Sequence, residues 1–126
     1  MKVILLLMVL IAQLSLVFAA DTVSGTVRFE GKPPAGVLFI MAKKYNSKMA
    51  MPLAVKKIEA PKFPVKFELS QKDAMMKSIP FKGPFKIMAK ISPSGGAMDK
   101  SGPNVMLDIP VNIGHKDLEL VLKNQK

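Results

Sequence analysis

Hydrophobic and polar residues alternate with a period of two along most of the chain after residue 21. In the first such segment, Val23, Val27 and Phe29 share one parity, while polar residues such as Arg28 take the other. Successive side chains on a strand point to opposite faces, so this pattern predicts a β-strand with one buried and one solvated face. The same alternation recurs over residues 52–58, 65–69, 85–91, 105–109 and 118–122.

The segment Val37–Ala42 is apolar on both parities, which predicts a central strand covered on both faces. Prolines and glycines separate the strands, as in Gly31–Pro34 and in Ser92–Asn104, which we expect to be a long exposed loop. Gln71–Lys77 lacks alternation, and we expect a loop or a single helical turn there. Short strands without any helical period predict an all-β fold, a small antiparallel Ig-like β-sandwich of about seven strands spanning residues 22–123.

Residues 1–19 have the layout of a secretory signal peptide. Lys2 is followed by an apolar run to Ala20 that only Gln13 and Ser15 interrupt. Small residues at the end of the run predict cleavage between Ala19 and Ala20. The alternative is an uncleaved N-terminal anchor, because the run approaches the ~20 residues that span a bilayer. In both cases we expect the domain to be periplasmic or secreted.

The residue inventory excludes most catalytic and metal-binding classes. Without cysteine the chain has no disulfide, thiolate metal site, thiol nucleophile or lipidated cysteine anchor. With one histidine, His115, the chain is poorly supplied for a histidine-rich zinc site or a Ser-His-Asp triad. The carboxylates are scattered, without the close spacing of a glycosidase pair or a calcium loop. We therefore predict that the chain is not an enzyme and requires no cofactor.

Several stretches, taken in order, resemble one known family. They are Val23–Val27, Met51–Lys57 after a strand ending in Ala42-Lys43, Phe67–Leu69 followed by Ala74-Met75-Met76, and Ala89–Met98. This set is similar to the C-terminal Ig-like periplasmic domain of CycH/CcmI-type cytochrome c biogenesis proteins, which are subunits of the haem-ligation machinery. The resemblance extends from Thr22 to about Leu122.

The resemblance implies a non-catalytic module that binds cytochrome c maturation proteins or other envelope proteins. Family members carry membrane helices and a tetratricopeptide region ahead of this domain, and those repeats are implicated in holding the apocytochrome. Here we expect the sandwich to follow the leader directly, so apocytochrome binding is not carried over. Contact with the membrane is expected only through an uncleaved N-terminal segment.

Methionine is unusually frequent, with ten in the chain. Met41, Met88 and Met106 fall in predicted strands, whereas five others fall in segments between strands: Met49, Met51, Met75, Met76 and Met98. Because alternate loops of a sandwich gather at one end, these five are candidate thioether ligands for Cu(I). The alternatives are that methionine fills irregular gaps over the core, or lines a groove for an apolar peptide. His115 is either an exposed turn residue or an additional ligand.

The positive charge is almost entirely lysine, and the formal net charge is +10. Lys43, Lys44, Lys56 and Lys57 adjoin the methionine-bearing segment and are candidate contacts for an acidic partner or anionic headgroups. The alternative is an ordinary solvated basic surface. Nucleic acid is not predicted as a partner, because base recognition favours arginine and stacking aromatics, and the chain has one arginine.

Overall fold

A computed structural model describes residues 21–48 and 51–124 of the chain. The predicted signal peptide, its cleavage site and Met49 lie outside these described residues. No helix within the described ranges has the length and apolar character needed to cross a membrane.

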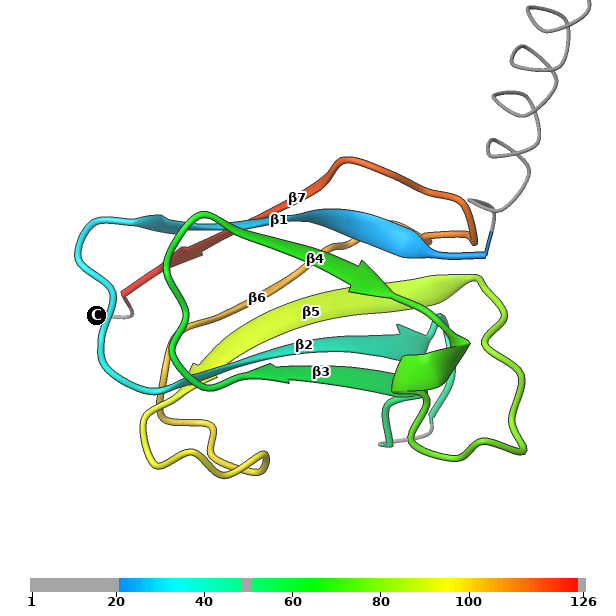
Figure 1. The fold of residues 1–126 in the computed structure, drawn as a ribbon, viewed down its shortest axis with the longest axis horizontal. Coiled ribbons are helices and arrows are strands. Elements are labelled where there is room, and N and C mark those ends of the chain that lie inside the picture. Colours follow the sequence, from blue (N-terminus) through cyan, green and yellow to red (C-terminus); the bar gives the residue numbers. More distant parts are fainter. Residues whose placement is uncertain (1–20, 49–50, 125–126) are drawn as a thin grey trace, which may run out of the picture.

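In the described residues, seven strands form two sheets that lie face to face (Figure 1). One short 3-10 helix follows the fourth strand. The elements are β1 (Val23–Glu30), β2 (Val37–Lys44), β3 (Ala54–Ile58), β4 (Val65–Leu69), η1 (Gln71–Asp73), β5 (Phe85–Ser92), β6 (Asn104–Met106) and β7 (Leu118–Lys123). One sheet has the strand order β4-β1-β7 and the other β3-β2-β5-β6. The predicted all-β sandwich of about seven strands is confirmed.

One pair of neighbouring strands is parallel, β1 with β7, while the other pairs are antiparallel. The parallel register begins where Gly25 lies opposite Leu118. A Cβ atom at Gly25 would lie 2.3 Å from the carbonyl oxygen of Leu118. Glycine is therefore required here because two backbones approach more closely than any side chain permits.

The core consists of one parity from each of the main strands. Its buried members are Val23, Val27, Leu38, Ile40, Ala42, Ala54, Phe67, Leu69, Phe81, Phe85, Ile87, Ala89, Ile91, Val111, Leu118, Leu120 and Leu122. On β2 the opposite parity is also buried, at Phe39 and Met41. The prediction that Val37–Ala42 is a central strand covered on both faces is thus confirmed at positions 38–42.

The strands expected over 52–58 and 105–109 differ from the structure at their boundaries, and the first begins at Ala54. The strand expected over 105–109 is limited to β6, because residues 108–110 leave the ladder before Val111 rejoins it by bonding Phe85. Pro110 has no N–H to donate, so the pairing with β5 cannot run on unbroken. The expected helical turn within Gln71–Lys77 is η1, and Ser70 N donates to Asp73 Oδ2 at 3.0 Å to hold its start.

Candidate protein-binding face

The outward surface of the three-stranded sheet is polar and carries both charges. Arg28 on β1 donates from Nε to Glu119 Oε1 on β7 at 2.5 Å. Thr26 lies between Lys66 on β4 and Glu119 on β7 in the strand register. Such a surface is well solvated and mixes both charges, so it offers little apolar area to a partner.

The outward surface of the four-stranded sheet is different, because methionines from three adjacent strands share one row. Met41 on β2 is the register partner of Met88 on β5, and Met88 is the partner of Met106 on β6. On its other side Met41 pairs with Val55 of β3. Directly opposite residues on one face of a sheet have Cβ atoms about 5 Å apart. Side chains of Val55, Met41, Met88 and Met106 therefore form a continuous apolar row across the sheet, which we call the methionine row.

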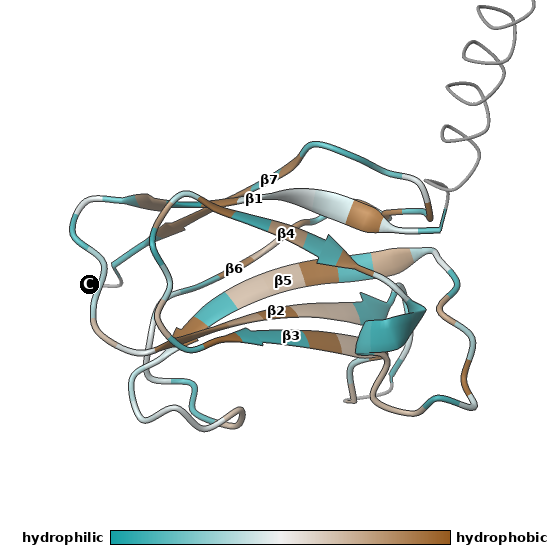
Figure 2. Ribbon diagram, viewed as in Figure 1, coloured by the Kyte–Doolittle hydropathy of each residue, from teal (hydrophilic) through white to brown (hydrophobic). Residues whose placement is uncertain are grey.

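Lysines border the methionine row on both sides. Lys43 pairs with Lys86 in the next outward row toward one end of the sheet. In the next outward row toward the other end, Phe39 lies between Lys57 and Lys90. Outward rows are two residues apart, so each lysine row lies about 6.7 Å from the methionine row. We call the three rows together the methionine–lysine face. In Figure 2, β2 is hydrophobic along most of its length and hydrophilic at its end, whereas β3 and β5 carry hydrophilic bands between hydrophobic ones.

The segment 93–103 between β5 and β6 closes one end of the face. Lys90 donates from Nζ to the carbonyl oxygens of Ala97 and Asp99, and its ammonium lies 5.8 Å from the centre of the Phe39 ring. These contacts leave Lys90 8% exposed and Phe39 4% exposed. The ammonium of Lys90 therefore holds the loop, and the Lys90 side chain covers Phe39. The sheet surface remains open on the side of Lys43 and Lys86.

Asp99 fixes the shape of this loop. Its carboxylate accepts hydrogen bonds from the hydroxyl and the backbone N–H of Ser101, at 2.7 and 2.9 Å, and from those of Ser94, at 2.7 and 3.1 Å. These hydrogen bonds hold the pKa of Asp99 well below its usual range, since they stabilise the charged form. The loop that covers Phe39 is thus an ordered element with its own polar network.

Exposure increases along the methionine row toward the edge of the sheet. Met41 is 8% exposed between its neighbours, Met88 is half-buried, and Met106 is 45% exposed. Thioether side chains of this kind adapt their shape to an apolar partner. The accessible apolar area therefore lies over β5 and β6.

The four candidate methionine ligands within the described residues, Met51, Met75, Met76 and Met98, are divided between two ends of the molecule. Met51 and Met75 lie on segments joined by the bond from Met75 N to Leu53 O at 2.9 Å, and Met76 follows directly. All three are about half exposed. Met98 belongs to segment 93–103, which starts at the opposite end of β5, about 23 Å away for a strand of this length. Figure 1 shows that segment far from η1. The expected convergence is thus limited, among the described residues, to Met51, Met75 and Met76.

His115 lies in the turn expected for it, where its N–H bonds Asn112 O and its carbonyl oxygen accepts from Ser24 N, both at 3.1 Å. No group of three or more His, Cys, Asp or Glu side chains that could hold a metal occurs in residues 21–48 and 51–124. In this part of the chain, no such cluster adds carboxylate or imidazole ligands to the methionines.

The four candidate lysines take three different positions. Lys43 and Lys57 lie on the methionine–lysine face, and Lys44 is exposed at the end of β2. Lys56 has the inward parity, opposite Ile40, and reaches across the open side of the sandwich. Its Nζ donates to Glu68 O at 3.0 Å and lies 3.6 Å from Asp73 Oδ1. Lys56 therefore joins the two sheets. As an inward-pointing charge, it also discourages the edge strand β3 from pairing with another chain.

Sequence reasoning missed Lys86, Lys90 and the row of strand methionines as a common surface. The alternation of Lys86, Met88 and Lys90 on the solvated parity of one strand is visible in the sequence. Their neighbours on that face come from strands far away in the chain, and only the register reveals them.

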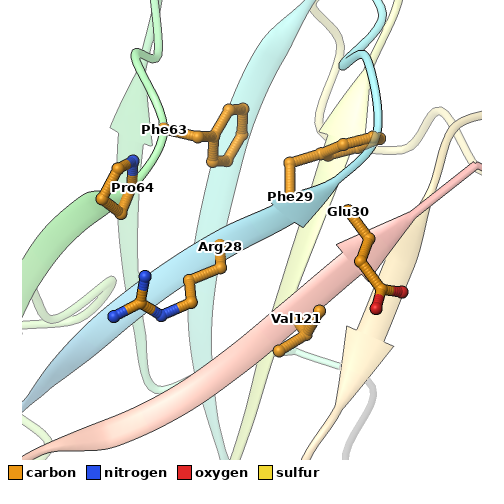
Figure 3. A pocket seen from close by; sticks show the side chains of 6 residues that line it. All are labelled: Arg28, Phe29, Glu30, Phe63, Pro64 and Val121. Carbon is orange, nitrogen blue, oxygen red and sulfur yellow. The ribbon is translucent and has the colours of Figure 1, made fainter.

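A pocket of about 350 Å³ lies elsewhere, on the side of the three-stranded sheet (Figure 3). It is lined by Arg28, Phe29, Glu30, Phe63, Pro64 and Val121. The Phe29 and Phe63 rings meet with centroids 5.6 Å apart, and Nε of Arg28 is occupied by Glu119. These lining side chains supply no nucleophile with an adjacent base, so the pocket lacks the groups of covalent catalysis.

Comparison with known proteins identifies relatives of this sandwich. Residues 22–122 match the family described as the cytochrome c-type biogenesis protein H Ig-like domain. A search of curated proteins finds no match. Among solved structures, an alternative pilotin from the type II secretion system of Vibrio cholerae is similar in fold, with a TM-score of 0.52 and 14% identity over 84% of this chain and 97% of that one. Because the family match covers the whole described sandwich, the chain belongs to the family of cytochrome c-type biogenesis protein H Ig-like domains.

Proposed function

We propose that this chain is a non-catalytic periplasmic protein that binds other envelope proteins as an accessory to cytochrome c maturation. The family match over residues 22–122 is the observation that carries this proposal. The export leader expected over residues 1–19 supports the compartment, and the lack of cysteine with a single histidine supports a role without catalysis.

The methionine–lysine face supports binding as the mode of action. It combines accessible thioethers with cations that have no carboxylate among the outward strand positions beside them. Adaptable methionine surfaces suit protein partners, and surrounding lysines favour an acidic one. The opposite outward face carries both charges, and Arg28 pairs with Glu119 there, so it is the control surface.

Affinity capture from envelope extracts tests this function. The full chain with a C-terminal tag is expected to retain subunits of the haem-ligation machinery or a c-type cytochrome. The double variant Lys43→Glu/Lys86→Glu is expected to lose them, while Lys66→Glu/Lys123→Glu, which makes the same charge change on the other sheet, retains them. Recovery of neither class of protein by the wild-type chain would rule the function out.

A second candidate function, Cu(I) carriage, is supported by the bond that joins the segments bearing Met51 and Met75. Thioethers bind Cu(I) without deprotonation, and exposed ones are accessible to the ion. We propose Met51, Met75 and Met76 as its ligands at that end, with Met49 and Met98 as the further candidates from the sequence.

Anaerobic Cu(I) titration of the full chain tests this second function. Replacing Met51, Met75 and Met76 together by leucine is expected to abolish binding, whereas Met98→Leu leaves it unchanged. Leucine keeps the size of the side chain and removes the sulfur, so folding is preserved. An affinity that is the same in the triple variant and the wild type would exclude this site.

A further inference from the structure

The dimensions of the methionine–lysine face define what it can hold. The methionine row crosses four strands, from Val55 on β3 to Met106 on β6. Strands in a sheet are about 4.8 Å apart, so the row is about 14 Å long. Lys43 and Lys86 lie about 6.7 Å from it on the open side of the sheet. On the other side the exposed cation is Lys57, because Lys90 is bound to the loop carbonyls. The face is thus an apolar row with two cations along one border and one on the other.

A short α-helix matches these dimensions. About ten residues of helix span 15 Å, with apolar side chains three and four residues apart along one stripe. A helix with its side chains is about 10–12 Å wide, so the side chains that flank its apolar stripe extend about 5–6 Å from the helix axis. Flanking side chains of a helix on the methionine row therefore end beside the lysine rows.

The charges on the face specify acidic flanks. Lys43 and Lys86 border the stripe on one side, and Lys57 borders it on the other. The outward positions of the four strands include no aspartate or glutamate in the described residues. Of the acids nearby, Glu59 lies 3.7 Å from Lys57, and the carboxylate of Asp99 is held by Ser94 and Ser101. A second copy of this basic face would be repelled.

Burial at the row favours a helix over a flat membrane. Met41 and Phe39 are nearly inaccessible, and Lys90 is bound to the loop carbonyls of residues 97 and 99. A membrane-binding surface needs apolar side chains that project beyond the lysines. Here the accessible apolar atoms lie between the lysine rows, where a cylinder with an apolar stripe reaches them.

We infer that the methionine–lysine face binds an amphipathic helix of about three turns, with an apolar stripe on the accessible Met88 and Met106 and acidic residues toward Lys43, Lys86 and Lys57. This inference rests on the proposed function, because it names the surface and the chemistry of the partner that the accessory role requires.

A synthetic helical peptide is the probe. A fluorescein-labelled 14-residue peptide with leucines along one stripe and glutamates on both flanks is titrated with the full chain, and its anisotropy is measured. Lys43→Glu/Lys86→Glu is expected to weaken binding at least tenfold, since two favourable charge contacts become repulsive. Lys66→Glu/Lys123→Glu, the matched change on the other sheet, is expected to change binding less than twofold.

The apolar part of the face has its own variant pair. Met106→Glu places a charge on the row and is expected to weaken binding at least tenfold. Val121→Glu places the same charge at a similarly exposed apolar residue of the other sheet and is expected to leave binding unchanged. A reciprocal peptide with lysine flanks is expected to bind Lys43→Glu/Lys86→Glu better than the wild type.

Three results would overturn the inference: no binding of the acidic peptide, equal losses in both lysine pairs, or tighter binding to phosphatidylglycerol vesicles with the same dependence on Lys43 and Lys86. Failure here is distinguishable from failure of the proposed function. If affinity capture retains maturation proteins equally well with Lys43→Glu/Lys86→Glu, the function stands and this surface is wrong.

Discussion

Met41 and Met88 lie directly opposite each other on the outward face of β2 and β5, and Met106 continues the same row on β6. Each methionine fills the gap beside the next, which leaves Met41 buried although it points away from the core. An outward apolar row on an otherwise basic surface thus packs within the sheet, in addition to the binding role proposed for it above.

The burial of Met41 predicts a gradient of oxidation along the row. Dilute hydrogen peroxide transfers an oxygen atom to an accessible thioether and leaves water. Met98 and Met106 are expected to become sulfoxides several-fold faster than Met41, since they are 84% and 45% exposed against 8%. Peptide mapping by mass spectrometry over a time course measures the rates. Equal rates at Met41 and Met106 would contradict the placement of Met41 inside the row.

Gly25 on β1 is expected to tolerate no side chain, because a Cβ atom there would overlap the backbone of β7. Gly25→Ala forces a Cβ to within 2.3 Å of the backbone of Leu118, so the free energy of unfolding falls by about 3 kcal/mol. Gly96→Ala is the control, because its Cβ would meet nothing closer than 3.6 Å, and its effect is expected within about 0.5 kcal/mol. Urea denaturation followed by circular dichroism gives both values, and a near-neutral Gly25→Ala would disprove the close parallel pairing.

Lys56 is expected to stabilise the sandwich rather than to contact a partner. Lys56→Ala removes its bonds to Glu68 and Asp73 and lowers the free energy of unfolding by about 1 kcal/mol. Lys57→Ala, one residue away on the exposed parity, is expected to change it by less than about 0.5 kcal/mol. The same urea experiment separates them, and capture of partners by Lys56→Ala should equal that of the wild type.

Asp99 is expected to make stability depend on pH in the acid range. Its pKa is lower in the folded chain than the ~3.9 of an unfolded aspartate, so its ionised hydrogen bonds stabilise the fold fully above that value and less as pH falls toward the folded pKa. The difference in urea midpoint between the wild type and Asp99→Asn should therefore be largest above pH 5 and shrink below pH 4. Gly96→Ala, in the same loop and without a titratable group, is the control, and its difference from the wild type should not change with pH. A difference that grows on acidification would show that the carboxylate is not bonded to Ser94 and Ser101.

The order of the strands and the face that each one buries could be predicted from the sequence to a large extent. The alternation at Val23–Phe29 and Phe85–Ile91 and the doubly apolar Val37–Ala42 correspond to β1, β5 and β2. The end of β6 was less predictable, because the expected pattern continued to Ile109 while the prolines around it interrupt the ladder. Inward Lys56 also departs from the rule that lysine faces water, since its ammonium finds the carbonyl oxygen of Glu68 on β4 and the carboxylate of Asp73 in η1.

The family and the sandwich could be predicted from local properties of the chain, because side-chain parity and turn residues are encoded within a few consecutive positions. The candidate site does not follow from them. Met41, Met88 and Met106 become neighbours only when β2, β5 and β6 pair in one register, and Met98 is separated from Met51 because their segments leave opposite ends of the sheet. Register is set by packing of the whole core, since a slip of one residue would turn every side chain to the other face. The sequence by itself therefore determined which residues face outward, and the tertiary structure decided which of them stand together.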